Sequence, residues 1–236
     1  MAKTIFVDLT RCTGCRGCQV ACKQWKNVPG EATKNWGSHQ NPPDLSYQSI
    51  RIVRFTEAML PDKEGKDKLA WLFFPEQCRH CYSAPCKRKA DQYDSGAILH
   101  DKDTGAVVFT DKIRKVPGDL LRAACPYDIP RAAPDGHGAS KCDFCFDRLQ
   151  NGMRPACVLS CPTGCLEFGE EEDMQALAAQ RLKKVKKEFP TAYLGDPLNA
   201  RVLYLYQADH RLYYQDASVS NPDNAITKGP RRVDGF

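Results

Sequence analysis

Stretches rich in β-branched and aromatic residues alternate with polar stretches along the chain, and this pattern predicts short strands. A turn-forming sequence, Pro-Asp-Lys-Glu-Gly-Lys, separates the second of these stretches from the third. Four strands are therefore expected, at residues 3–8, 50–55, 69–74 and 201–206.

Two helices and one hairpin complete the expected framework. A first helix is expected from about 17 to 26, and a second from about 170 to 188. The second is acidic at its start and basic at its end, as the helix dipole favours. Short apolar runs at 97–99 and 106–109, joined by Asp-Lys-Asp-Thr-Gly, predict a β-hairpin.

Two polar segments are expected to lie outside this framework. An insertion containing Gly and Pro spans about 28–46, and a tail begins at about 217. We expect the tail to be flexible or to lie on a partner. The basic runs Lys87–Lys89 and Lys183–Lys187 are expected to be solvated faces.

Length and composition narrow the functional class. The 236 residues are enough for one or two domains with a real core. No stretch approaches 18 consecutive apolar residues, so no membrane span is expected. The N-terminal residues show no apolar export-signal core and no twin arginine. The net charge of +5 comes without a basic stripe interleaved with aromatic residues, which argues against nucleic-acid binding.

The cysteine content narrows the functional class most. The chain has thirteen, an odd number, and most of them stand two or three residues apart. Disulfide scaffolds are usually short and secreted, so metal binding is the better interpretation.

The N-terminal cysteine run indicates which metal. Cys12, Cys15, Cys18 and Cys22 follow the spacing C-x2-C-x2-C-x3-C, by which bacterial ferredoxins hold 4Fe–4S clusters. In such a run three cysteines bind one cluster and the fourth binds a different cluster. Other runs in the chain must therefore supply the missing ligands.

Three further groups of cysteines are present. They are Cys78-x2-Cys81-x4-Cys86, the pair Cys125-Pro126, and Cys142-x2-Cys145-x11-Cys157-x3-Cys161-Pro162. Counting the ferredoxin spacing onward from Cys86 gives Ala90, and counting it back from Cys125 gives Leu121, Gly118 and Lys115. A fourth cluster would need these four positions, and none of them is a cysteine.

Pairing the runs as nested halves, each lending its last cysteine to the other, uses twelve cysteines and predicts three complete 4Fe–4S clusters. The predicted ligand sets are Cys12, Cys15, Cys18 and Cys161 (site A); Cys22, Cys142, Cys145 and Cys157 (site B); and Cys78, Cys81, Cys86 and Cys125 (site C).

These residues admit other interpretations. The Cys-x2-Cys pairs at 78/81 and 142/145 could contribute to tetrathiolate zinc sites, but zinc explains neither the three-cysteine run nor the two Cys-Pro endings. Cys165 is expected to be a buried thiol that binds no metal. His80 is expected to hydrogen-bond near site C and not to ligate.

The chain has no evident catalytic constellation of its own, and Gly14 and Gly17 are expected to let backbone N–H groups approach the cluster sulfurs. With this cysteine map it resembles the four-cluster ferredoxin-like subunits of molybdenum/tungsten-pterin oxidoreductases, and most of all the formate dehydrogenase beta subunit. The resemblance covers about residues 3–170 and rests on Asp8-Leu-Thr-Arg-Cys12-Thr-Gly-Cys15-Arg-Gly-Cys18-Gln-Val-Ala-Cys22-Lys-Gln-Trp25, Asn41-Pro-Pro-Asp-Leu-Ser46, Arg54-Phe-Thr-Glu57, Cys125-Pro-Tyr-Asp-Ile-Pro130, Lys141-Cys-Asp-Phe-Cys-Phe-Asp-Arg148 and Pro155-Ala-Cys-Val-Leu-Ser-Cys-Pro-Thr-Gly164.

This resemblance implies an α+β fold with two pseudo-twofold-related bacterial ferredoxin-like subdomains, insertions and a C-terminal helix/strand extension. The first subdomain, residues 1–30 plus 134–170, would hold two 4Fe–4S clusters. The second, residues 47–133, would hold one. Residues 171–236 would form the extension and pack on a partner subunit.

The resemblance also implies a function: electron transfer within a heterodimer whose large Mo/W-bis-pterin subunit oxidises formate or reduces CO2. The cluster missing here is the one farthest from the catalytic subunit in membrane-bound relatives. We therefore expect a soluble enzyme and a soluble acceptor such as a multihaem c-type cytochrome. Lys87, Arg88, Lys89 and Lys115 would fill or flank the vacated site and help to dock the acceptor.

Two alternatives to this function stay open. The same subunit could serve a polysulfide, sulfoxide or tetrathionate reductase, or the chain could be a stand-alone polyferredoxin. The expected location is the periplasm, reached by export together with a signal-bearing partner, and the alternative is the cytoplasm.

Overall fold

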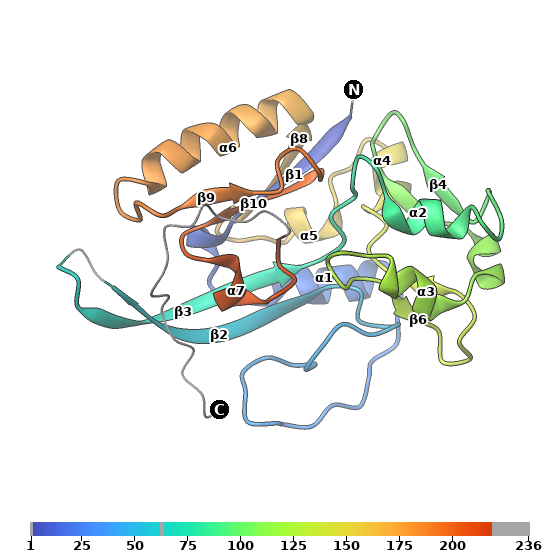
Figure 1. Ribbon diagram of the computed structural model, residues 1–236, viewed down its shortest axis with the longest axis horizontal. Coiled ribbons are helices and arrows are strands. Elements are labelled where there is room, and N and C mark those ends of the chain that lie inside the picture. Colours follow the sequence, from blue (N-terminus) through green and yellow to red (C-terminus); the bar gives the residue numbers. More distant parts are fainter. Residues whose placement is uncertain (1, 62–63, 219–236) are drawn as a thin grey trace.

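The computed structural model describes residues 2–61 and 64–218 as a mixture of short helices and small sheets (Figure 1). The elements follow in the order β1 (Lys3–Asp8), η1 (Leu9–Arg11), α1 (Gly17–Trp25), β2 (Ile52–Pro61), β3 (Asp67–Glu76), α2 (Pro85–Ala90), β4 (Ile98–His100), β5 (Val107–Phe109), η2 (Asp111–Lys115), α3 (Gly118–Ala123), β6 (Arg131–Ala132), β7 (Ala139–Ser140), α4 (Phe146–Gln150), α5 (Ala156–Leu159), β8 (Leu166–Glu170), α6 (Glu171–Val185), β9 (Tyr193–Gly195), β10 (Val202–Tyr206) and α7 (His210–Tyr213).

The largest sheet has the strand order β8-β1-β10-β9, with β1 and β10 parallel and the outer pairs antiparallel. Side chains of a strand alternate between its two faces, so each inner strand contributes to two apolar layers. Phe6 and Leu203 face α6, which lies along one side of the sheet (Figure 1). Ile5 and Tyr204 face the opposite side, where the main core lies.

The main core is completed by the long antiparallel hairpin β2–β3, which is paired from Ile52 with Glu76 to Pro61 with Asp67. Phe74 of β3 is fully buried, and its ring lies 4.9 Å from that of Tyr204. The hairpin therefore holds the sheet and the cysteine-bearing segments against one another.

The helices that carry or lead into the cysteines form two pairs: α1 packs against α5, and α2 packs against α3. The α2–α3 pair lies with the small hairpin β4–β5 at the right of Figure 1, around an apolar cluster of its own.

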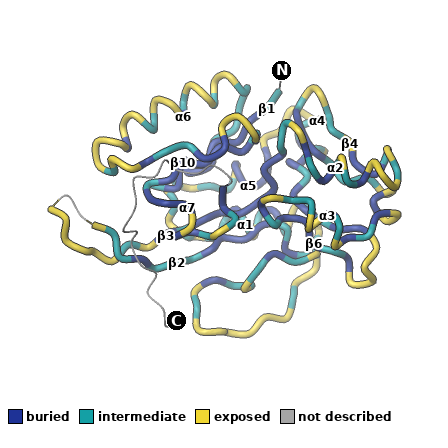
Figure 2. Tube along the Cα trace, viewed as in Figure 1, coloured by how far each residue is buried: buried dark blue, intermediate teal, exposed yellow. Residues whose placement is uncertain are grey.

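The insertion at 28–46 contains no helix or strand and is largely exposed over its first half (Figure 2). Its end is fixed by charge: the Asp44 carboxylate pairs with Arg54 at 2.5 Å and with Arg131 at 2.8 Å. Burial would raise the pKa of Asp44, but these two guanidinium groups keep it below its usual value.

The expected α+β character is confirmed, as are the N-terminal strand, both helices, the hairpin near 97–109 and the last strand. The β2–β3 strands are longer than predicted, because cross-strand pairing carries them beyond their apolar centres. The predicted tail lies outside the described residues from position 219, whereas Ala217 and Ser218 are buried.

The described part of the C-terminal segment lies within the main body of the molecule. Strands β9 and β10 share the sheet of β1, and α6 packs against β1. Across residues 2–61 and 64–218, none of the helices combines the length and apolar character needed to cross a bilayer.

Candidate metal centres

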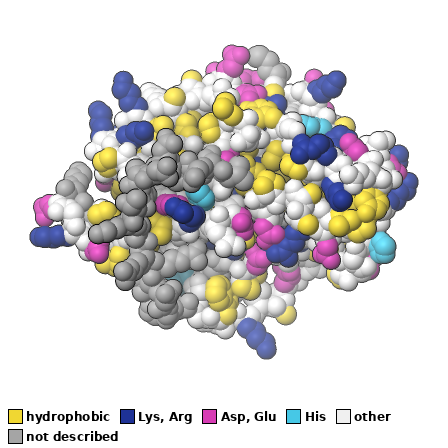
Figure 3. Space-filling view, in the orientation of Figure 1, with side chains coloured by type: hydrophobic (Ala, Val, Ile, Leu, Met, Phe, Trp, Pro, Cys, Tyr) yellow, Lys and Arg dark blue, Asp and Glu magenta, His cyan; other side chains and the backbone are white. Residues whose placement is uncertain are grey.

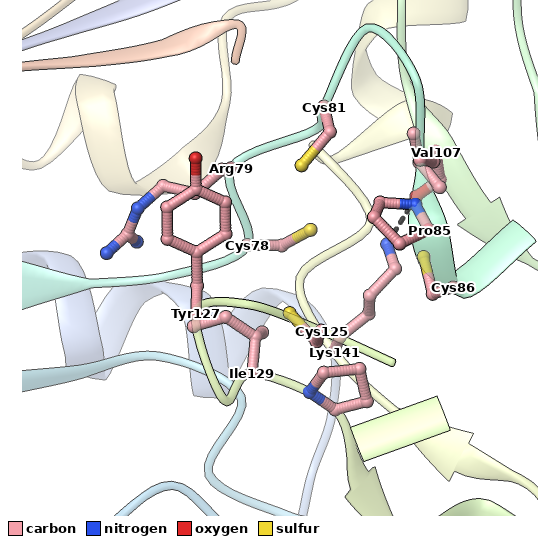
Figure 4. A pocket seen from close by; sticks show the side chains of 12 residues that line it. Cys78, Arg79, Cys81, Pro85, Cys86, Val107, Cys125, Tyr127, Ile129 and Lys141 are labelled. Carbon is pink, nitrogen blue, oxygen red and sulfur yellow. Dashed lines mark hydrogen bonds between the residues drawn. The ribbon is translucent and has the colours of Figure 1, made fainter. Parts of the chain in front are cut away.

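Site C is a cavity of about 340 Å³, partly open to solvent, whose wall includes all four cysteines predicted to act together. Cys78 and Cys81 come from the turn after β3, Cys86 from α2, and Cys125 from the segment after α3. Figure 4 shows their side chains surrounding one space, with the Lys141 amine beside it. Four thiols around one cavity are the donor set that a 4Fe–4S cluster requires.

Site A is a second cavity, of about 300 Å³, between the N-terminal loop and the segment after α5. Its wall includes Cys12, Cys15, Cys18 and Cys161, the four cysteines predicted for it, together with Cys165. Cys165 is buried as predicted, but it lies at the site and not apart from it. A hydrogen bond from Cys165 lowers the pKa of Cys161 to about 4 and also lowers the pKa of Cys12.

The cysteines of site B are all buried. Burial, together with the nearby Cys157 and Cys145 thiols, raises the pKa of Cys22 to about 12. The pKa of Cys142 is also raised, first by burial and then by the Cys22 thiol. These influences place the Cys22 thiol near those of Cys142, Cys145 and Cys157, the cysteines predicted to act with it.

One backbone conformation recurs in three of the four Cys-x-x-Cys turns, those that begin at Cys12, Cys78 and Cys142. The residue before the second cysteine is left-handed in each: Gly14 (φ 66°), His80 (φ 48°) and Phe144 (φ 67°). In two turns the N–H of this residue points at the first cysteine, with His80 N at 3.5 Å from Cys78 Sγ and Phe144 N at 3.4 Å from Cys142 Sγ. A left-handed conformation in non-glycine residues is costly and tends to occur at functional sites.

Gly14 has a further reason to be glycine. A Cβ at this position would lie 2.9 Å from the ring of Phe73, in addition to the strain of its positive φ. Phe73 of β3 thus packs directly on the turn that presents Cys12 and Cys15.

His80 hydrogen-bonds near site C, but its imidazole bonds away from the cysteines. The ring Nδ1 accepts a hydrogen bond from the Val107 N–H at 3.0 Å, and the ring stacks on Phe144 at 4.4 Å. Complete burial keeps the pKa of His80 well below its usual value, so the ring is neutral. Only the backbone N–H of His80 reaches a cysteine sulfur.

The end of α1 is tied to the loop that carries Cys142 and Cys145. Lys26 Nζ lies 2.6 Å from Asp143 Oδ2 and 2.9 Å from Asp147 Oδ1, and Trp25 Nε1 donates to Asp147 at 2.8 Å. These contacts fix Cys22, on the last turns of α1, relative to its predicted partners.

The three sites follow one another in the order A, B, C. Besides burial, the Cys157 thiol of site B raises the pKa of Cys18 in site A, and the Cys78 thiol of site C raises that of Cys142 in site B. Site B is fully buried, whereas Cys15 of site A is exposed and Cys81 and Cys125 of site C are partly exposed. The end sites reach the surface and the middle site does not.

The positions that a fourth cluster would need are closed. Ala90 and Leu121 are fully buried in the apolar cluster of α2 and α3. A Cβ on Gly118 would lie 2.3 Å from the Gly138 carbonyl oxygen, so no side chain fits there. Lys115 is exposed and pairs with Asp94 at 2.6 Å. Apolar packing, and not the basic residues, fills this position.

Two buried cations beside these sites did not emerge as site residues from the sequence. Arg51 is only 2% exposed, and among the described residues none supplies a nitrogen or oxygen partner to its three guanidinium nitrogens. Lys141 is 7% exposed and lines site C. A buried unpaired charge is very unfavourable, so these sites fit an anionic group such as a thiolate-ligated cluster. The only signal in the sequence was the position of Lys141 directly before Cys142.

Within the described residues, no group of three or more His, Cys, Asp and Glu side chains is arranged around a single metal ion. Most of the thiols are costly to ionise without metal, since burial raises the pKa of Cys86 to about 12 and those of Cys125 and Cys145 to about 11. Metal ligation would supply the positive charge that these thiols need in order to bind as thiolates.

Comparison with known proteins agrees with this chemistry. A family model described as a 4Fe-4S dicluster domain matches residues 69–171. The chain is 47% identical to the formate dehydrogenase subunit beta of Megalodesulfovibrio gigas over 92% of this chain and 99% of that protein. It is 48% identical to the "formate dehydrogenase 2 subunit beta (cytochrome c-553)" of Nitratidesulfovibrio vulgaris, with the same coverage. It is 37% identical to the formate dehydrogenase-O iron-sulfur subunit of Escherichia coli over 94% of this chain and 72% of that protein.

Proposed function

The chain belongs to the family of formate dehydrogenase beta (iron-sulfur) subunits, and we propose that it relays electrons through three 4Fe–4S clusters in such a complex. The relay would run between a Mo/W-bis-pterin catalytic subunit, which interconverts formate and CO2, and a soluble acceptor. The observation that carries this proposal is the order of the sites: a fully buried middle site between two that reach the surface.

Twelve cysteines hold the clusters in this proposal, as sites A, B and C. When bound, each cluster supplies a one-electron redox couple. The protein's own contribution is to exclude water from site B by burial and to direct backbone N–H groups at the sulfurs of Cys78 and Cys142. Hydrogen bonds to sulfur and solvent exposure both set a cluster's potential.

A pseudo-twofold arrangement of two ferredoxin-like halves is part of the proposal. Each of the four helices in the pairs α1–α5 and α2–α3 carries, or leads into, two residues that stand four positions apart. These four pairs of residues occupy equivalent positions in the two halves. In the first pair these are Cys18/Cys22 and Cys157/Cys161, and in the second pair Cys86/Ala90 and Leu121/Cys125. Residues four apart lie on one helix face, so each such pair can serve two neighbouring sites.

The count of three, and not four, is supported by the packing at the fourth position. Ala90 and Leu121 stand where cysteines would be needed, and both are buried against apolar neighbours. The relay would therefore end at site C.

The catalytic subunit would cover site A. Beside that site, Leu159 of α5 is 68% exposed and Val20 of α1 is 62% exposed, although both helices are otherwise packed together. Exposed apolar side chains next to an exposed ligand such as Cys15 suit a surface that a partner buries.

The soluble acceptor would dock near site C, where α2 presents Lys87, Arg88 and Lys89. Lys87 pairs with Asp91 at 2.8 Å, but Arg88 and Lys89 bond only to neutral side chains. Basic and acidic side chains are interspersed over the face seen in Figure 3. The name of the N. vulgaris relative includes cytochrome c-553, which supports a c-type cytochrome as acceptor. A periplasmic location, reached by export with the partner, belongs to the same proposal.

The test is formate-dependent reduction in the complex. The chain is co-expressed with a Mo/W-bis-pterin formate dehydrogenase catalytic subunit, and the anaerobic complex is treated with formate while its EPR spectrum is recorded. We expect cubane signals to form, and to disappear when oxidised c-type cytochrome is added. A complex that reduces polysulfide, a sulfoxide or tetrathionate, but does not react with formate, would overturn the choice of substrate.

A further inference from the structure

Each boundary between neighbouring sites contains one buried cation: Arg51 lies between sites A and B, and Lys141 lies between sites B and C. We call these two residues the junction cations. Neither forms an ion pair with a carboxylate among the described residues. Both side chains are buried, so their place beside the cysteines is fixed by the packing of the interior.

Arg51 has its charged neighbours on two sides. Two residues further along the chain, Val53 packs in the core cluster that contains Cys18 of site A and Cys157 of site B. The thiols of Cys157 and Cys18 are also the strongest electrostatic neighbours of the Arg51 guanidinium. The same guanidinium acts in turn on Cys12 of site A and Cys22 of site B. Its three nitrogens have no nitrogen or oxygen partner within the part of the chain that is described.

Lys141 repeats this arrangement at the next boundary. Its amine donates hydrogen bonds to the carbonyl oxygens of Val107 and Cys142, the latter at 2.9 Å, and these bonds aim it into the wall of site C (Figure 4). The cavity wall that Lys141 lines also holds Cys78 and Cys86 of site C, and Cys142 of site B follows it directly in the sequence. The amine therefore lies between two thiol sets.

A third buried cation, Arg79, shows what an ordinary structural arginine looks like in this fold. Its guanidinium donates to the carbonyl oxygens of Gln77 and Ala217 and stacks on the ring of Tyr204. Arg79 is therefore held by hydrogen bonds to protein groups, whereas the three guanidinium nitrogens of Arg51 have no nitrogen or oxygen partner among the described residues and lie near the thiols of Cys157 and Cys18 and the ring of Tyr204. The difference indicates that Arg51 is placed for an anionic group that the protein itself does not supply.

We propose that Arg51 and Lys141 set the reduction potentials of the clusters on either side of them, by stabilising the added electron at both flanking sites. The proposal rests on the three-cluster function above. Reduction adds one negative charge to a cluster, and a fixed cation in a low-dielectric interior stabilises that charge strongly. Because each cation serves two sites, it also offsets the repulsion between neighbouring reduced clusters.

The shared placement predicts a pattern across the three clusters. Removing the Arg51 charge should lower the potentials of clusters A and B but not C. Removing the Lys141 charge should lower those of B and C but not A. One cluster, B, should respond to both changes.

The experiment is EPR-monitored redox titration of the complex containing Arg51→Met, Lys141→Met or the unchanged chain, after iron and sulfide analysis of each. We expect the reduced-to-oxidised ratio of each flanking cluster, at fixed ambient potential, to fall about tenfold or more, which corresponds to about 59 mV for a one-electron couple. The charge-retaining variants Arg51→Lys and Lys141→Arg should stay within about twofold of the unchanged chain. Lys184→Met, which removes an exposed charge on α6, is the matched control.

Potentials that move no more in Arg51→Met and Lys141→Met than in Lys184→Met, with all clusters present, would overturn the inference and leave the proposed function standing. If the neutral variants lose iron but Arg51→Lys and Lys141→Arg keep it, the cation is required at the site and the proposal is supported. If neutral and charge-retaining variants lose iron equally, packing explains the residues and the proposal fails. An unchanged chain without cubane clusters would instead refute the proposed function.

Discussion

The two helix pairs of this protein use similar backbone geometry for different ends. The pair α1–α5 carries or leads into four cysteines, at 18, 22, 157 and 161, and cavities or buried thiols surround it. The pair α2–α3 has cysteines at two of the corresponding positions, Cys86 and Cys125, and apolar residues at the other two, Ala90 and Leu121. One side of the second pair faces the cavity of site C, and its other side is solid core.

This difference teaches that side chains, more than the backbone, decide whether a half of the fold can hold a cluster at a given position. Leu121 occupies space near the fourth position, and the chain closes on Gly118 until no Cβ fits. In the proposed three-cluster relay, apolar contacts occupy this position and stabilise the fold without metal.

The largest effect is expected from removing a ligand on the cavity side. Cys125→Ala should lose cluster C, because three thiolates remain where the cluster needs four. Iron should fall from about twelve to about eight per chain, measured with acid-labile sulfide on anaerobic protein. Cys165→Ala is the matched control, since it also removes a buried thiol from a site wall, and it should keep about twelve. An iron loss in Cys165→Ala equal to that in Cys125→Ala would mean that Cys165 is a ligand.

On the side of the α2–α3 pair that is filled by apolar core, a substitution should change the stability of the protein and not its iron content. Leu121→Ala creates a cavity at a fully buried position, so we expect it to lower the free energy of unfolding by about 2–5 kcal/mol. Thermal denaturation of the anaerobic protein measures this, and the iron content should not change. Leu159→Ala, at an exposed leucine, should change stability by no more than about 0.5 kcal/mol. Loss of four irons from Leu121→Ala would show that a cluster does occupy this half.

Gly118→Ala tests how tightly the fourth position is closed. The added methyl group would meet the Gly138 carbonyl and the Cα of Ala132, at 2.3 and 2.7 Å, and neither of these backbone atoms can move cheaply. We expect a loss of about 1–3 kcal/mol in unfolding free energy. For the same reason, replacing Ala90, Lys115, Gly118 and Leu121 together by cysteine should not restore a fourth cluster. A gain of about four irons in that variant would contradict the closed packing.

The smallest effect is expected from removing surface charges of α2. Arg88→Gln together with Lys89→Gln removes two charges of α2 that bond only to neutral side chains. Electron transfer to a c-type cytochrome should slow by several-fold at low salt, and its dependence on salt should weaken. Lys184→Gln with Lys187→Gln, two exposed lysines beyond site C in sequence, is the control. Equal rates in both double variants at every salt concentration would remove α2 from the docking surface.

Much of the framework could be predicted because its elements carry clear local signals. β1 is a continuous β-forming run, and α6 is acidic at its start and basic at its end. The helices α2, α3 and α5 were not predicted, since they have only six, six and four residues and owe their form to the packing around the cysteines. The parallel pairing of β1 with β10 joins residues almost 200 positions apart, which no local pattern can indicate.

The candidate sites also combine features that the local sequence predicts with features that only the fold creates. Spacing alone grouped the cysteines that line the two cavities, because a ligand run fixes its neighbours locally. The junction cations could not be found this way: Arg51 belongs to a β-forming stretch and reaches the sites only through the fold. Burial of the thirteenth cysteine was predicted, but its place in the wall of site A was not.

The number of clusters per chain tests most directly whether the α2–α3 half holds one cluster fewer than the α1–α5 half. Iron and acid-labile sulfide should be measured per chain on anaerobically purified protein, with EPR of the dithionite-reduced sample. About twelve of each, with magnetically coupled cubane signals, is the result expected if α2 and α3 enclose apolar core at the fourth position. About sixteen of each would contradict the account, because a fourth cluster would then have to lie where Ala90, Gly118 and Leu121 are packed.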